Sequence, residues 1–440
     1  MTRVLSADWV LPVEGPPIQD GAVAIEGGRI AAVGPASELG AGTRYEGSAI
    51  LPGLVNAHTH VEYAVYGGFG DGLSDFSAWI ALHMERKGRI GFDDYAAIAR
   101  LGAAESLRSG VTTIGDCSFS GAAAIACADL GLRAVVYLEA FGSDPQAALS
   151  NVARSRERAA EAWSERVRPG VSPHAPYSTS ADVYEACAGL GLPLATHLSE
   201  GPSEVEYLLS GSGAWAGFGP GLVDPPGMTG TRMLESRGLL GPGVLAAHCV
   251  RVDAEEIGLL AARGVGVAHC PRSNAALGCG VAPLRELLDA GVRVGLGTDS
   301  PASAPSLDAF EELRAALLTA RARAERPDAL TPREALELAT LGSARAMGLG
   351  AEIGSLAPGK RADLTVLDLS DSGYVPWEDP AAAVVFGGSP ERIRATLVDG
   401  DFRYVRGEER QWLEELRSSA RLARGRMLRG AEVHAPATRR

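Results

Sequence analysis

Two histidines separated by a single residue, His58 and His60, have the residue types and spacing best suited to chemistry in this sequence. They end an apolar, strand-like stretch that leads out of the turn at Pro52-Gly53. Side chains at positions i and i+2 of a strand point to the same face, so both imidazoles are expected to project toward one point. Such a pair suits a metal ion, zinc in particular. Because a His-x-His pair can also lie on an ordinary polar face, the metal interpretation requires partners elsewhere in the chain.

The candidate partners are four histidines and one aspartate that each follow a short β-prone segment. They are His174, His197, His248, His269 and Asp299. A lone histidine at a strand end more often has a structural role, but a whole set at successive strand ends favours one shared site. His83 and His434 lie outside this pattern and are assigned no role.

The segment from about residue 50 to residue 350 alternates β-branched stretches with Ala- and Leu-rich helical stretches. Strands are expected at residues 110–115, 133–138, 192–196, 244–247, 265–268 and 292–296, and helices at residues 96–109, 154–167 and 203–210. Repeated β-then-α units of this length predict a parallel sheet closed into a (β/α)8 TIM barrel, with the site at the C-terminal strand ends. An open doubly wound sheet is the alternative, but it would usually carry a G-x-G-x-x-G after its first strand, and none is seen there.

The two ends of the chain read instead as short strands and turns. A hairpin is expected around Gly27-Gly28, but residues 1–50 are too few to form a core alone. We therefore predict three parts: a small β-sandwich from residues 1–50 and 356–407, a barrel from residues 51–355, and a helical tail from residues 408–440. The last barrel helix is expected to begin at Thr331-Pro-Arg-Glu334, which has the pattern of a capping box, and to run to about Met347.

Composition limits the classes of protein that this chain could be. Apolar residues make up 46% of the 440 residues and charged residues 22%, which is ordinary for a soluble globular protein. The net charge of −13 argues against a nucleic-acid partner. No run of 18 or more apolar residues predicts a membrane span, and the first residues lack the apolar segment of a secretory signal. The six cysteines form no C-x-x-C pair, so reduced, buried thiols and a cytoplasmic location are expected. A homo-oligomer is possible, and the sequence does not decide the oligomeric state.

Five motifs together resemble those of the amidohydrolase superfamily. They are Pro52-Gly-Leu-Val-Asn-Ala-His-Thr-His60, Thr196-His-Leu-Ser-Glu200, Ala247-His-Cys249, His269-Cys-Pro-Arg-Ser-Asn274 and Gly297-Thr-Asp-Ser300. Within the superfamily, the chain resembles the nucleoside and base deaminases, a branch that includes S-adenosylhomocysteine/methylthioadenosine deaminases and aminodeoxyfutalosine deaminases. The resemblance covers nearly the whole chain, and it is more specific for the superfamily than for the substrate.

The resemblance implies that one divalent metal ion, zinc or alternatively iron, is bound by His58, His60, His197 and Asp299. No lysine is found at the strand position that bridges a second metal in the binuclear branch, so a mononuclear site is expected. Glu200 would be the proton shuttle, which protonates the ring nitrogen beside the attacked carbon and then the leaving ammonia. A solvated carboxylate at a helix start is the structural alternative for Glu200. His248 and Asp299 would orient the attacking water and help to deprotonate it.

The predicted substrate contacts are His174, His269, Trp79 and Glu62. His174 resembles a residue that contacts the nucleoside, and Trp79 resembles an aromatic residue that covers the base, with helix packing as its alternative. Glu62, the following Tyr63 and residues 137–142 resemble the aminodeoxyfutalosine deaminase group. S-adenosylhomocysteine deaminases hold an amino-acid carboxylate with an arginine after the third barrel strand. Residues 137–141 of this chain contain no arginine there.

These features predict a metal-dependent hydrolytic deaminase. The expected substrate is a 6-aminopurine nucleoside such as aminodeoxyfutalosine, methylthioadenosine or an adenosine derivative, and ammonia would be released. A guanine deaminase and a triazine-type chlorohydrolase are the alternatives that use the same barrel. A non-catalytic scaffold relative is a third alternative from a different class.

Overall fold

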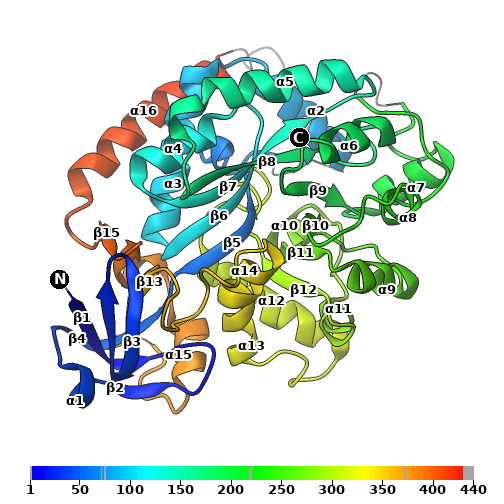
Figure 1. Ribbon diagram of the computed structural model, residues 1–440. Coiled ribbons are helices and arrows are strands. Elements are labelled where there is room, and N and C mark those ends of the chain that lie inside the picture. Colours follow the sequence, from blue (N-terminus) through cyan, green and yellow to red (C-terminus); the bar gives the residue numbers. More distant parts are fainter. Residues whose placement is uncertain (1, 71, 74–75, 218–220, 371–372, 430–440) are drawn as a thin grey trace, which may run out of the picture.

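Eight parallel strands form the central barrel of the computed structural model, which describes residues 2–70, 72–73, 76–217, 221–370 and 373–429 (Figure 1). Each strand pairs with its neighbours in chain order. The strands are β5 (Leu54–Thr59), β6 (Val111–Ser118), β7 (Arg133–Ala140), β8 (Val167–Pro173), β9 (Leu194–Leu198), β10 (Val244–His248), β11 (Gly266–His269) and β12 (Arg293–Leu296). The predicted TIM barrel is confirmed, and every β segment expected from the sequence overlaps one of these strands.

The barrel closes between its first and last strands, β5 and β12. The backbone N–H of Asp299 donates to the carbonyl oxygen of His58 at 3.0 Å. Beside it, the Asn56 side chain accepts from the backbone N–H of Thr298 at 3.0 Å and donates to the Thr298 hydroxyl at 2.8 Å. Closure of the barrel therefore brings His58 next to Asp299, although about 240 residues separate them in the chain.

Helices cover the outside of the barrel. They include α3 (Phe92–Arg108), α4 (Ala122–Leu130), α5 (Pro145–Arg158), α6 (Ala181–Ala188), α7 (Pro202–Ser210), α8 (Gly230–Ser236), α9 (Ala254–Arg263), α11 (Leu284–Asp289) and α12 (Ala309–Ala324). The helix expected at residues 154–167 differs, because α5 ends at Arg158 and a short 3-10 turn leads into β8. The turn leaves room for the β-prone segment that starts at Val167.

The last barrel helix begins as predicted, with a capping box between Thr331 and Glu334 in α13 (Pro332–Glu337). It is not one continuous helix, because a π-helical segment, η3 (Leu338–Gly342), separates α13 from α14 (Ser343–Ala346). The hydroxyl of Ser343 donates to the carbonyl oxygen of Leu338 and accepts from the backbone N–H of Leu296. The change of helix type thus coincides with direct packing of the chain against β12.

The two chain ends meet in a second sheet. Its strand order is β15-β14-β13-β4-β1-β2-β3, and it joins β1 (Arg3–Val10), β2 (Ile18–Glu26), β3 (Arg29–Pro35) and β4 (Thr43–Pro52) to β13 (Leu364–Asp368), β14 (Ile393–Val398) and β15 (Asp401–Val405). The expected hairpin joins β2 and β3, and Gly27 and Gly28 both have positive φ. The sequence predicted a β-sandwich from both ends; the structure joins the same segments in one continuous mixed sheet, because β4 and β13 pair edge to edge.

This sheet packs against the N-terminal ends of the barrel strands. Arg133, at the start of β7, donates to both carboxylate oxygens of Asp363 at 2.8 and 3.1 Å and to Asp399 at 2.6 Å. The hydroxyl of Thr365 donates to the carbonyl oxygen of Gly110, just before β6, at 2.7 Å. The N-terminal face of the barrel is therefore occupied by structural contacts, and the C-terminal face is left for chemistry.

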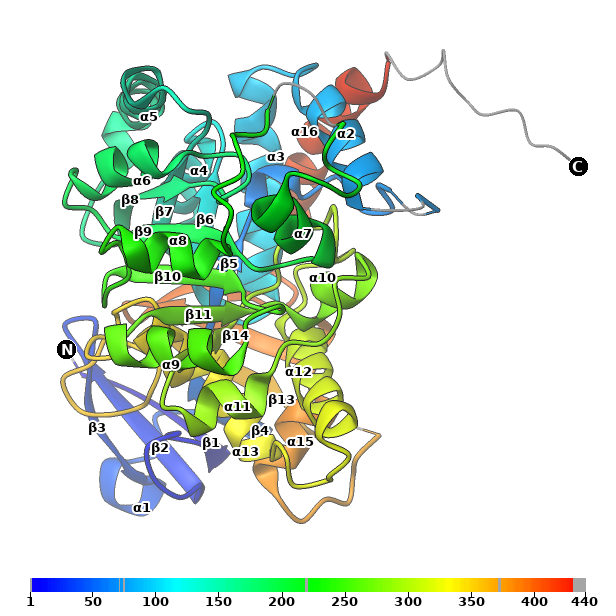
Figure 2. The same cartoon turned by 90° about the vertical axis from the view of Figure 1, so that its right-hand side faces the viewer.

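The C-terminal helix α16 (Arg410–Leu428) runs along α3, as Figures 1 and 2 show in red. Its last turn reaches the loop after β5, where Met427 packs with Tyr63 and Tyr66, and Arg424 donates to the carbonyl oxygen of Val65 at 3.0 Å. Residues 430–440 of the predicted tail, including His434, lie outside the described residues. In the described part of the chain, no helix is long and apolar enough to cross a membrane.

Candidate active site

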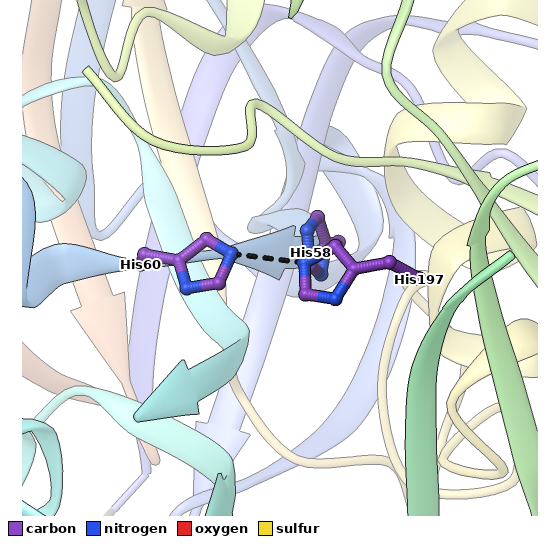
Figure 3. A group of neighbouring side chains, drawn as sticks. All are labelled: His58, His60 and His197. Carbon is purple, nitrogen blue, oxygen red and sulfur yellow. Dashed lines mark hydrogen bonds between the residues drawn. The ribbon is translucent and has the colours of Figure 1, made fainter. Parts of the chain in front are cut away.

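The four predicted metal ligands lie together at the C-terminal end of the barrel. Nε2 of His58 and Nε2 of His60 are each 3.4 Å from Oδ1 of Asp299. His197, at the end of β9, approaches from the other side and places its Nε2 3.3 Å from that of His60. Figure 3 shows the three imidazoles converging from β5 and β9. Three imidazole nitrogens and one carboxylate oxygen, all buried, make a donor set that suits a divalent metal ion.

The hydrogen bonds of the ring nitrogens test whether a cation fits here. Nδ1 of His60 lies 2.8 Å from the carbonyl oxygen of Cys117, and Nδ1 of His197 lies 2.8 Å from that of His174. A carbonyl only accepts, so both Nδ1 atoms carry the proton and both Nε2 atoms present lone pairs. Two lone pairs that face each other at 3.3 Å repel, and a cation between them removes that repulsion. Nε2 of His58 is also buried and has no hydrogen-bond partner among the described residues. The site therefore fits a divalent metal.

Ionisation of these groups agrees with ligand roles. Burial, together with the charge of His58, lowers the pKa of His60 to about 3, and burial lowers the pKa of His197 well below its usual value. Burial alone would raise the pKa of Asp299, but its contacts with the imidazoles of His58, His60 and His248 lower it well below its ordinary range. Neutral imidazoles and an ionised carboxylate are the forms that bind metal ions.

The second oxygen of Asp299 is held in place by two hydroxyls. Ser273 and Ser303 donate to Oδ2 at 2.7 and 2.9 Å, which leaves Oδ1 facing His58 and His60. Asp299 has a φ of 55°, a left-handed conformation that is unfavourable for residues other than glycine. His248 (φ 73°) and Ser199 (φ 52°) share this feature at the ends of β10 and β9. Backbone strain of this kind concentrates at functional sites, and here it turns the chain at the ends of three strands on the C-terminal face of the barrel.

Glu200 and His248 form a second pair beside the ligands. Oε1 of Glu200 lies 3.8 Å from Nε2 of His248, and Nδ1 of His248 is 2.9 Å from Oδ1 of Asn274. Burial raises the pKa of Glu200 well above its usual value, and the nearby charges of Asp299 and Glu204 add to this. Burial lowers the pKa of His248 to about 4. A buried carboxyl that retains its proton and a neutral imidazole are suited to donate and to accept protons at one site.

A cavity of about 680 Å³ opens beside this cluster. It is lined by His60, His197, Glu200, His248 and Asp299, and by the predicted substrate contacts Trp79 and His174. The indole N–H of Trp79 donates to the carbonyl oxygen of Ala302 at 3.1 Å, and Nδ1 of His174 lies 2.7 Å from the Ser178 hydroxyl. The structure therefore brings three of the four predicted ligands, the predicted proton shuttle and two predicted substrate contacts to one cavity, and the fourth ligand, His58, lies directly behind them.

Two other predicted substrate contacts lie elsewhere. The buried carboxylate of Glu62 accepts from the Ser118 and Ser120 side chains and from backbone N–H groups of the loop before α4 and of its first turn. Glu62 does not line the cavity. The chain leaves β5 at Thr59 and enters a 3-10 turn, η1 (Val61–Tyr63), so the strand alternation that aims His58 and His60 at the site stops before Glu62. His269 is also buried outside the cavity lining. The expectation that Glu62 and His269 touch the substrate does not match these positions.

Several cavity residues were given no role from the sequence. His83 and Lys87 line the cavity from α2 (Phe76–Lys87), the helix that also carries Trp79. The sequence pattern that could have identified them is their spacing, since positions 79, 83 and 87 follow each other at intervals of four residues and share one helix face. The ring of His83 stacks on that of Trp79 at a centroid distance of 5.3 Å. Glu139, near the end of β7, faces Lys87 across the cavity wall.

Comparison with known proteins agrees with this geometry. Residues 49–403 match the Amidohydrolase family. The chain belongs to this family. The 5-methylthioadenosine/S-adenosylhomocysteine deaminase of Syntrophobacter fumaroxidans is 37% identical over 406 residues, which cover 89% of each chain. The 5'-deoxyadenosine deaminase of Methanothermobacter thermautotrophicus is 34% identical over 93% of this chain and 97% of that protein.

A solved structure shows the same fold with a metal present. The adenosine deaminase from Xanthomonas campestris, determined with bound zinc, superposes with a TM-score of 0.83 at 29% identity and covers 96% of this chain and 98% of that chain. The predicted family membership is confirmed. This chain is therefore a hydrolytic deaminase of the amidohydrolase family with a site for a divalent metal.

Proposed function

We propose that this enzyme hydrolyses the 6-amino group of an adenine-type nucleoside to give the 6-oxo product and ammonia. The observation that carries the proposal is the placement of Glu200, a buried carboxyl in the nucleoside-sized cavity beside the four-residue cluster of His58, His60, His197 and Asp299. The names of the relatives at 34–37% identity, which act on methylthioadenosine, S-adenosylhomocysteine and 5'-deoxyadenosine, support the same substrate class.

The cluster would hold one divalent metal ion, which we propose to be zinc. Such an ion, when bound, lowers the pKa of a water molecule to about 7 and so supplies a nucleophile at neutral pH. The remaining steps fall to the side chains of this chain. Asp299 and the neutral His248 lie on one side of the cluster, where they orient the attacking water and accept its proton.

Glu200 is assigned the proton transfers on the substrate. Because its pKa is raised, the carboxyl holds a proton that it can deliver to the ring nitrogen next to the attacked carbon. Protonation neutralises the negative charge that addition of the nucleophile would otherwise place on that ring nitrogen. As the 6-oxo group forms, the attached hydroxyl loses its proton, which the Glu200 carboxylate accepts and passes to the amino group, so that ammonia leaves. The proton that Asp299 and His248 accepted from the water would then restore the carboxyl of Glu200.

Aromatic and imidazole groups would hold the purine. Trp79, fixed by its hydrogen bond to Ala302 and by stacking on His83, would cover the base. His174 has its Nδ1 engaged by Ser178, which leaves Nε2 as the nitrogen that can contact the purine. Burial and the nearby charge of Lys87 lower the pKa of His174 well below its usual value, so it contacts the substrate as a neutral group.

Ammonia release from adenosine, 5'-deoxyadenosine, methylthioadenosine, S-adenosylhomocysteine and aminodeoxyfutalosine tests this proposal. The zinc-loaded enzyme is expected to turn over at least one of these nucleosides. Guanine and a chlorinated triazine belong in the same panel as controls for the alternative substrates. Failure on every adenine nucleoside with metal bound, or activity confined to guanine or to chloride release, would contradict it.

A further inference from the structure

Lys87 and Glu139 face each other inside the cavity, although they come from different parts of the fold. Lys87 ends α2, and Glu139 lies on the inward face of β7 with Val135 and Tyr137. Their side chains are only 13% and 3% exposed, and both residues line the cavity. A cation and an anion are thus held at the wall of a site for which neither the sequence nor the family resemblance assigned them a role.

The pair does not satisfy its own hydrogen-bonding capacity. Nζ of Lys87 is 3.7 Å from Oε2 of Glu139, beyond the usual hydrogen-bond range of about 2.7–3.2 Å. Oε2 has no hydrogen-bond partner among the described residues. The other neighbours of the ammonium are rings: Nζ lies 3.5 Å from the centroid of Phe119 and 5.1 Å from that of Phe141. Aromatic faces stabilise the charge but accept no conventional hydrogen bond.

Ionisation indicates that each charge is only partly compensated. Burial raises the pKa of Glu139 to about 7, although the charge of Lys87 opposes this shift. Burial also lowers the pKa of Lys87 despite the nearby carboxylate. Buried charges that lack hydrogen bonds are costly. A polar ligand group between Lys87 and Glu139 would therefore be stabilised by hydrogen bonds to both charges.

The pair lies close to the proposed metal cluster. The ring of Tyr63 stacks on that of His60 at a centroid distance of 5.6 Å, and Nζ of Lys87 is 5.9 Å from the centroid of Tyr63. A single aromatic ring therefore lies between a metal ligand and the ammonium. On the other wall, the ring of Phe141 is 4.8 Å from that of His174. The pair and the cluster therefore line one cavity, close enough together to contact different parts of a single nucleoside.

The chemistry of the pair selects one kind of ligand. A substrate carboxylate would be attracted by Lys87 but repelled by Glu139, and a substrate amine would meet the reverse arrangement. Two adjacent hydroxyls can donate to the carboxylate and accept from the ammonium at the same time. We propose that Lys87 and Glu139 bind the vicinal hydroxyls of the substrate's sugar and make the enzyme selective for ribosides. This inference rests on the proposed function and deepens it.

The test compares adenosine with 2'-deoxyadenosine and 3'-deoxyadenosine, using the zinc-loaded enzyme and its Lys87→Met and Glu139→Gln variants. A hydrogen bond to a charged group is lost with each hydroxyl, so kcat/KM of the wild type is expected to fall roughly ten- to a hundredfold for each deoxynucleoside. In both variants this preference should shrink to about threefold or less, because adenosine loses most of its advantage while the deoxynucleosides change little. Glu85→Gln, on the exposed side of the same helix, is the matched control and should keep the full preference.

Each other result has a defined meaning. Equal kcat/KM values of the wild type for all three nucleosides would by themselves overturn the sugar subsite. A variant that loses kcat/KM equally for all three nucleosides would also overturn it. A wild-type preference for S-adenosylhomocysteine that Lys87→Met alone abolishes would overturn it in favour of a carboxylate site. No turnover of any adenine nucleoside by the wild type would refute the proposed function and, with it, the subsite.

Discussion

The Glu200→Gln substitution should remove proton transfer at this site without changing the structure around it. Glutamine has nearly the shape of glutamate but cannot transfer the proton. The backbone around Glu200 is held independently of its side chain, since the N–H groups of Ser199 and Glu200 both donate to the carboxylate of Glu204 at 2.9 and 2.6 Å. Because the pKa of Glu200 is raised, its charged form is unfavourable in the folded protein. The variant should therefore be as stable at neutral pH as the wild type, or more stable.

The size of the effect follows from the groups that line the cavity. Among the described residues there, carboxyls are carried by Glu139, Glu200 and Asp299. Asp299 faces the metal cluster and Glu139 faces Lys87, so neither can replace the shuttle. General acid–base catalysis contributes about 10²–10⁴-fold, and the absence of a substitute favours the upper half of that range. We expect kcat to fall by about 10³–10⁴-fold, with KM within a few-fold of its wild-type value.

Steady-state ammonia release, with bound metal measured on the same samples, checks this expectation. Glu204→Gln is the matched control, because Glu204 is equally buried but bonds to the backbone. It should lower the free energy of unfolding by about 1–3 kcal/mol and reduce kcat far less than Glu200→Gln does. Retention of more than a tenth of wild-type kcat by Glu200→Gln, or a loss that tracks metal content, would refute the assigned role.

Three further predictions concern the frame around the site. Arg133→Leu removes the guanidinium that pairs with the buried carboxylate of Asp363 below the barrel, so urea unfolding should show a loss of about 3–5 kcal/mol, while a loss below about 1 kcal/mol would contradict the structural role. Arg424→Ala removes the bond from α16 to the loop after β5 and should raise KM more than it lowers kcat; an unchanged KM would argue against that contact. Burial raises the pKa of Asp368, but hydrogen bonds from Ser370 and two arginines lower it below its usual value. Asp368→Asn should therefore lower the free energy of unfolding at pH 7, and this difference should fade below about pH 4; an equal difference at pH 3 would contradict it.

Much of the fold could be predicted from the sequence because the signals were local and repeated. Each barrel strand is a short β-branched segment followed by a helix, and parallel strands joined in this way place all their C-terminal ends on one face. That rule alone predicts His58 and His197 at the same end of the barrel. The side-chain alternation of a strand then predicted that His58 and His60 act together, and the structure places their Nε2 atoms at the same oxygen of Asp299.

The remaining features depended on information that is not local. In the sequence, Glu62 continues the i, i+2 spacing of His58 and His60. In the structure, the chain enters a 3-10 turn at Val61 and directs the carboxylate into a loop. Lys87 could be assigned to a helix face, but not to the cavity, because the position of α2 depends on packing against the loop after β5 and against α16. The sequence predicted a small β domain from both chain ends, but not that one continuous sheet forms it, because the pairing of β4 with β13 is a contact between distant segments.

The most direct test of metal-dependent deamination is a zinc titration of metal-free enzyme, with ammonia release from an adenine nucleoside as the readout. We predict no activity without metal and a linear rise that ends at one zinc ion per chain, since both candidate ligand groups among the described residues share His58. Asp299→Asn should abolish the response. Full activity in the metal-free protein would contradict a metal-dependent mechanism, and a rise that continues to a second ion would contradict a mononuclear site.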